Sequence, residues 1–129
     1  MFQIIKTRDF NLKLKATIHK SGRLGFTSDT ARSLNLTPQS YAKFAKDDED
    51  NEQLYLVLVD NSDEDTFTFT KSGAYFYLPT TAMFQSFGYD FKKYNFMFDL
   101  VRIEDLDAIA GGQVYKLNKR TTMKKTKAS

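Results

Sequence analysis

The chain has 129 residues, of which 41% are hydrophobic and 15% aromatic, and a formal net charge of +3 at neutral pH. A chain of this length can bury a self-sufficient core as one domain, and its aromatic content favours strands over disorder. Because it contains no cysteine, disulfides, zinc fingers and thiolate chemistry are excluded. The sequence shows no signal-like start and no apolar run of membrane length, which predicts a cytoplasmic protein without membrane contact.

Positive charge is concentrated at the C-terminal end. Six Lys and Arg residues fall in the last fourteen positions, so the rest of the chain carries a net charge of −3. Residues 119–129 lack apolar periodicity, and we predict a disordered basic tail there. Because polycationic segments bind phosphates, Lys124, Lys125 and Lys127 are candidate nucleic-acid contacts, with a solubilising end as the alternative.

The first half is predicted to form two strands, a short helix and two further strands. Apolar and polar residues alternate before the turn Lys20-Ser21-Gly22, as in a half-buried strand. Thr27 or Ser28 can cap the helix, and Pro38 prevents it from continuing. Residues 1–10 are expected to add an edge strand. The four expected strands span 12–18, 23–27, 41–45 and 54–59.

The second half repeats this order of elements. Its helix is expected to open at Pro79 and to end at Gly88. The strands are expected at 66–71, 75–78, 95–103 and 113–117. The matching segments are Lys20-Ser21-Gly22 with Lys71-Ser72-Gly73, Thr30-Ala31 with Thr81-Ala82, and, after a two-residue insertion, Leu34-Asn35-Leu36 with Phe87-Gly88-Tyr89.

The repeat predicts one domain rather than two. A unit of about 50 residues with a two-turn helix is marginal alone, so residues 11–60 and 65–118 should pack together. The acidic link at 60–65 is short, which favours a single compact domain over residues 1–118. The predicted fold class is therefore mainly β (α+β), a pseudo-two-fold β-barrel built from two tandem ββαββ units.

The order of strand, Gly-Arg turn, strand, short helix and hairpin resembles the AbrB/MazE swapped-hairpin family of DNA-binding proteins. In tandem it is similar to the MraZ arrangement. The residues that carry the resemblance are Gly22-Arg23, Arg32, Leu34 and Leu36, whereas Ala74 stands in the second unit where the family has arginine. The resemblance implies a swapped-hairpin barrel and a transcriptional regulator that binds DNA through Arg23 and Arg32.

Further basic residues flank the first turn. Lys15 and Lys20, with Lys13 and His19, can extend a positive strip beside Arg23. The alternative is that lysines on an exposed strand only discourage edge pairing. His19 is the single histidine and has no partner at a catalytic or metal-ligand spacing.

The acidic loops do not predict a metal site. The loop that begins at Asp60 has Asp65 where a calcium loop needs glycine and Lys71 where it needs glutamate, so solvated turns are the better interpretation. Phosphate-binding, dinucleotide and nucleophile motifs are also missing. We therefore predict a non-enzymatic protein without cofactor, metal or small-molecule substrate.

Aromatic residues crowd the second half. Phe67 and Phe69 on one strand, and Tyr75 and Tyr77 on the next, can face the core or the solvent. Exposed rings would mark a protein partner or would stack bases, as in single-strand binders of the Whirly kind. The alternative function is thus a structural or interaction protein, such as a phage or mobile-element component, virion protein or assembly factor.

Overall fold

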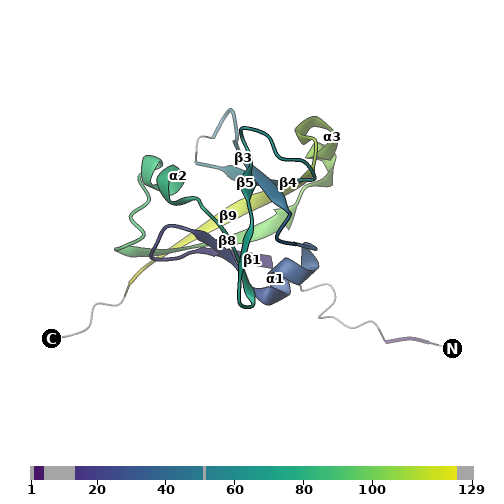
Figure 1. Cartoon of the computed structure of the whole chain (residues 1–129), viewed down its shortest axis with the longest axis horizontal. Coiled ribbons are helices and arrows are strands. Elements are labelled where there is room, and N and C mark those ends of the chain that lie inside the picture. The colour runs from purple at the N-terminus through teal and green to yellow at the C-terminus, as the bar shows by residue number, and fades with distance from the viewer. Residues whose placement is uncertain (1, 5–13, 51, 125–129) are drawn as a thin grey trace.

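The chain folds into a nearly closed antiparallel β-barrel, seen in a computed structural model that describes residues 2–4, 14–50 and 52–124 (Figure 1). The strands are β1 (Leu14–Ile18), β2 (Leu24–Phe26), β3 (Tyr41–Lys46), β4 (Leu54–Val59), β5 (Phe67–Thr68), β6 (Thr70–Ser72), β7 (Tyr75–Leu78), β8 (Tyr94–Arg102) and β9 (Gln113–Met123). The helices are α1 (Ser28–Ser33), α2 (Thr81–Ser86) and α3 (Asp107–Ala110), the last preceded by the 3₁₀ turn η2 (Glu104–Leu106).

The sheet closes through the segment that contains β5 and β6. The strand order is β5-β3-β4-β9-β8-β1-β2-β7-β6, and all pairs are antiparallel. β5 pairs with β3 at one end of this order and β6 pairs with β7 at the other. Only Phe69 separates β5 from β6, so one continuous segment joins the two ends of the sheet. The mainly β barrel predicted from strand periodicity is confirmed.

Aromatic side chains fill the barrel. Phe26, Phe69, Phe84 and Phe98 are among the largest fully buried residues. The Phe84 ring stacks on Phe98 with centroids 6.0 Å apart, which links α2 to the centre of β8. Burial of one such ring contributes about 1.5–3 kcal/mol, so these contacts dominate the packing between helix and sheet.

Both six-residue helices end in the same kind of turn. After α1, the Leu36 N–H donates to the Ala31 carbonyl over 2.9 Å across Asn35, whose φ is +55°. After α2, Tyr89 donates to Phe84 over 3.1 Å across a glycine of φ +80°. A left-handed residue after a helix satisfies carbonyls that have no further helical partner. At the start of α1, the Thr27 side chain accepts from Thr30 N–H, as the predicted cap requires.

Several predicted boundaries differ from the structure. Lys119 to Met123 continue β9 and pair with β8, so the predicted disordered tail is wrong over this stretch. The polar side chains of this segment do not predict a strand, but its backbone pairs with the nine-residue strand β8. The helix α2 begins after Pro79, with Thr80 as its N-cap. The edge strand expected at 1–10 shows no strand at 2–4 and otherwise lies outside the described residues.

Within the described part of the chain, no helix is long and apolar enough to cross a membrane.

Candidate nucleic-acid interface

The turn between β1 and β2 carries Lys20 and Arg23. Its ends are closed by two backbone hydrogen bonds, from His19 N–H to the Arg23 carbonyl (2.9 Å) and from Gly22 N–H to the His19 carbonyl (2.8 Å). Gly22 has φ +88°, and a Cβ there would approach the Phe91 ring to 2.8 Å. Glycine is therefore required both by backbone conformation and by packing.

Two threonines at the start of α2 hold this turn from the other half of the chain. The buried Thr80 hydroxyl accepts from Leu24 N–H and donates to the Gly22 carbonyl, each over 3.0 Å. The Thr81 hydroxyl donates to the Ser21 carbonyl over 2.7 Å. The turn that presents Lys20 and Arg23 is thus fixed by contacts across nearly 60 positions of sequence.

An aromatic and cationic cluster covers the outer face of the sheet beside the turn. Gly25 lies under it, and an added Cβ there would collide with the His19 imidazole and reach 3.0 Å from Tyr77. The His19 and Tyr77 rings meet edge to face with centroids 5.0 Å apart, and Tyr75 stacks against Tyr77. The Arg23 guanidinium lies 4.5 Å from the Tyr77 centroid. Arg23 is held against an aromatic face while its other side stays exposed.

The surroundings of His19 change the pKa of its imidazole. Burial, and secondarily the positive charge of Arg23, lower the pKa of the His19 imidazole. The lowered pKa favours the neutral imidazole at neutral pH.

Two other segments bring positive charge to the same side of the barrel. The Lys124 ammonium donates to the Phe91 carbonyl over 2.6 Å, and the Phe91 ring packs beneath Gly22. Lys92 and Lys93 follow Phe91 and are exposed. In Figure 1 the purple β1–β2 turn, the green segment after α2 and the yellow end of β9 lie on one side of the barrel. We call the turn 19–23, residues 91–93 and Lys124 the basic end.

The remaining predicted site residues lie elsewhere or outside the described residues. Arg32 is on α1, where its side chain faces Asp29 at 3.5 Å and borders a groove with Lys71. Arg32 lies near the Phe76 end of β7. Arg23 lies near the other end, because it precedes Leu24, which pairs with Leu78. Lys15 is half-buried on β1, away from the turn. Lys125 and Lys127, and also Lys13, lie outside the described residues.

Sequence reasoning missed the residues that build the site around Arg23. Thr80 and Phe91 show no motif, because their roles depend on contacts with Gly22 from the other half of the chain. Tyr77 was one of a pair whose orientation period-2 alternation alone leaves open. The structure places Phe76 inside the barrel and Tyr75 outside with 44% of its surface exposed.

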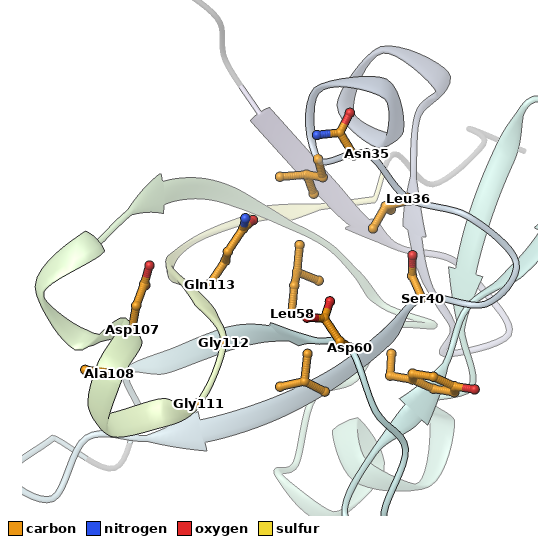
Figure 2. A pocket seen from close by; sticks show the side chains of 13 residues that line it. Asn35, Leu36, Ser40, Leu58, Asp60, Asp107, Ala108, Gly111, Gly112 and Gln113 are labelled. Carbon is orange, nitrogen blue, oxygen red and sulfur yellow. The ribbon is translucent and has the colours of Figure 1, made fainter.

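A separate cavity of about 430 Å³ lies where the end of α1, the end of β4 and the α3–β9 connection meet (Figure 2). Its polar lining includes Asn35, Ser40, Asp60 and Gln113. At its edge, Asp107 receives two 2.6 Å hydrogen bonds from Arg102, and these lower the pKa of the Asp107 carboxyl. Ionised carboxylates repel phosphate, so this cavity is not part of the candidate nucleic-acid interface.

Among the residues that the structure describes, no group of three or more histidine, aspartate or glutamate side chains could hold a metal ion.

No family model, curated protein or solved structure matches the chain.

Proposed function

We propose that the protein binds DNA through the basic end and acts as a transcriptional regulator. The observation that carries this proposal is the turn 19–23, in which Lys20 and Arg23 are presented on a backbone fixed by Thr80 and Gly22. Arginine offers a planar fork of donors that fits phosphate oxygens and guanine edges. A cation already held against Tyr77 loses little conformational freedom on binding.

We further infer that the barrel consists of two tandem ββαββ units that exchange hairpins, as in the swapped-hairpin regulators. In support, the closed strand order is unchanged when β1, β2, β3 and β4 are exchanged with β5–β6, β7, β8 and β9. The two hydrogen bonds that end the helices, Leu36 to Ala31 and Tyr89 to Phe84, are related by one interval of 53 residues. Such a relation favours duplication of one unit.

The two halves differ in the chemistry that they present. In the second half, Ala74 follows Gly73 where Arg23 follows Gly22, and Gln85 takes the place of Arg32 at the interval of 53. The basic end therefore grips the DNA backbone from one side, and the opposite side of the barrel contributes no equivalent arginine. Contact from one side makes fewer phosphate contacts, which favours modest affinity and a correspondingly shallow salt slope.

The proposal is tested by fluorescence anisotropy with random duplex and single-stranded DNA over a salt series. Each phosphate contact adds about −0.9 to the log-log salt slope on duplex DNA. We expect Lys20→Ala and Arg23→Ala each to weaken binding and to reduce the slope by about 1. Arg32→Ala is the matched control, because it removes an exposed arginine outside the basic end.

A truncation must spare β9, which extends to Met123. Removing residues 125–129 deletes only two basic residues, Lys125 and Lys127, and measures their nonspecific contribution to DNA binding. Binding that survives this truncation and falls with Arg23→Ala supports the proposal. Binding that disappears with the truncation, or that is unchanged by both turn variants, overturns it.

The exposed Tyr75 ring favours one second candidate, a structural or interaction protein that uses the outer face of β7. Exposed aromatic residues are enriched at protein interfaces. Absence of nucleic-acid binding in the same salt series would select this candidate, and Tyr75→Ser would then be the first variant to test in partner capture.

A further inference from the structure

The second half of the barrel's longest strand, β9, has a strand partner on only one side. From Gln113 to Leu117, β9 pairs with β4 on one side, and from Tyr115 onward it pairs with β8 on the other. From Asn118 to Met123 it pairs with β8 alone, and no other strand of the described residues borders it. An edge of this length exposes backbone donors and acceptors that can pair with another strand.

The direction of one hydrogen bond shows which residues face this open side. The Leu117 carbonyl accepts from Gln53 Nε2 over 2.9 Å, on the side where β4 lies. The N–H and C=O of one strand residue point to the same side, and successive residues alternate. Lys119, Thr121 and Met123 therefore direct their backbone groups toward the open side.

We propose that this edge pairs with the same edge of a second copy, antiparallel about a two-fold axis at Thr121. In this register Lys119 lies opposite the second copy's Met123, and Arg120 lies opposite its Thr122. Registers centred on Lys119 or on Arg120 place that residue opposite its own copy, and the register centred on Thr122 places Arg120 opposite Lys124. Like charges directly opposed on neighbouring strands are destabilising, so the axis at Thr121 is the favoured choice. This inference goes beyond DNA binding and does not depend on it.

The surface beside the edge accommodates the incoming strand. A cavity of about 310 Å³ borders it, lined by Leu54 of β4, Lys119 of β9 and the Phe87 to Tyr89 turn. The Lys119 ammonium lies 4.6 Å from the Tyr89 centroid. Met123 is 67% exposed, and in the proposed register it packs against Lys119 and Tyr89 of the other copy. Thioether–aromatic contacts of this kind are favourable.

Charge complementarity also favours a second copy as the occupant. Antiparallel pairing directs the second copy's chain beyond Met123 toward the loop between β3 and β4. That loop, residues 47–52, contains five acidic residues, and it leads into Leu54, which pairs with Leu117. The first residue beyond Met123 is the basic Lys124, so opposite charges meet at both ends of the paired edges.

The most direct test uses single-cysteine variants, because the chain has no native cysteine. Residues directly opposite on antiparallel strands have Cα atoms about 4.5–5.5 Å apart, within the range of about 4.4–6.8 Å that a disulfide bridges. Thr121→Cys should therefore form a disulfide-linked dimer under mild oxidation. Asn118→Cys is the matched control on the same strand, because in this register its two copies are about 20 Å apart.

Sedimentation of the uncrosslinked protein over a concentration series tests the energetics. Thr121→Pro should abolish association, because it removes a donor of the open side and leaves the β8 pairing intact, whereas Thr121→Val should preserve it. Thr122→Glu should tighten the dimer and Thr122→Lys should weaken it, each by about 2- to 30-fold for two charge pairs.

Faster disulfide formation at position 121 than at 118, with opposite effects of the two Thr122 variants, supports the proposal. A monomer at all concentrations, or equal crosslinking at both positions, overturns it and means that Lys119 and Arg120 protect the edge from pairing. Circular dichroism of each variant confirms that the barrel is intact before the association is measured.

Discussion

Replacement of Thr80 by valine tests how the two halves of the chain are joined. The side chain is completely buried, and valine has nearly the same shape. The change removes the hydroxyl that accepts from Leu24 N–H and donates to the Gly22 carbonyl. Each buried polar group that loses its partner costs about 1–3 kcal/mol. With two such groups, we expect Thr80→Val to lower the free energy of unfolding by about 2–6 kcal/mol.

The assay is urea unfolding followed by tyrosine fluorescence, with a thermal melt in parallel. A loss of about 2–6 kcal/mol corresponds to a Tm lower by roughly 7–22 °C for a domain of this size. Thr81→Val is the control, because its hydroxyl donates to the Ser21 carbonyl at an exposed position, where water can replace it. We expect this control to cost less than about 1 kcal/mol. Equal losses for the two variants, or a loss below about 0.5 kcal/mol for Thr80→Val, would refute the reasoning.

Three further predictions concern the core and two titratable groups. Phe84→Ala removes a fully buried ring that stacks on Phe98, and it should cost about 3–5 kcal/mol in urea unfolding. Because the pKa of His19 is lowered in the folded protein, the unfolded chain takes up a proton first as pH falls. The wild type should therefore lose stability relative to His19→Gln between pH 7 and 5, as measured by urea midpoints. Because the pKa of Asp107 is lowered in the folded protein, its ionised form stabilises the fold at pH values above the ordinary carboxyl pKa. The Tm of Asp107→Asn should therefore be furthest below that of the wild type at pH 7, and the difference should shrink below about pH 4.

Local patterns were sufficient for the fold class. The alternation of Leu14, Ala16 and Ile18 with polar residues gave β1 the right faces, since Ala16 and Ile18 are buried. Thr27 caps α1 as its side-chain chemistry predicts. Patterns failed where polar residues form strands, as at 119–123, because pairing with β8 rather than an apolar face keeps that segment in place.

The alignment of the two halves was only partly right. The match of Thr30 with Thr81 does not correspond to equivalent helix positions, because the N-caps Thr27 and Thr80 are 53 residues apart. The identity of Thr30 and Thr81, which are 51 residues apart, is therefore coincidental. The match of Asn35 with Gly88 does coincide with two left-handed residues that follow the helices.

Of the candidate site, the sequence identified the charges but not their grouping. Arg23 and Lys20 could be selected from their place in a turn, and Arg32 from the family resemblance. Whether such residues gather depends on long-range contacts, and here Arg23 and Arg32 belong to different surfaces. The association of Lys124 with the turn depends on Phe91, which lies under Gly22 and about 70 positions away in sequence.

The measurement that most directly tests DNA binding at the basic end is an NMR titration of the ¹⁵N-labelled chain with a short random duplex. The account predicts that amide shifts concentrate in residues 19–23 and 91–93 and at Lys124, and that they weaken as salt is raised. Shifts concentrated on α1 around Arg32, or no shifts at low salt, would contradict it.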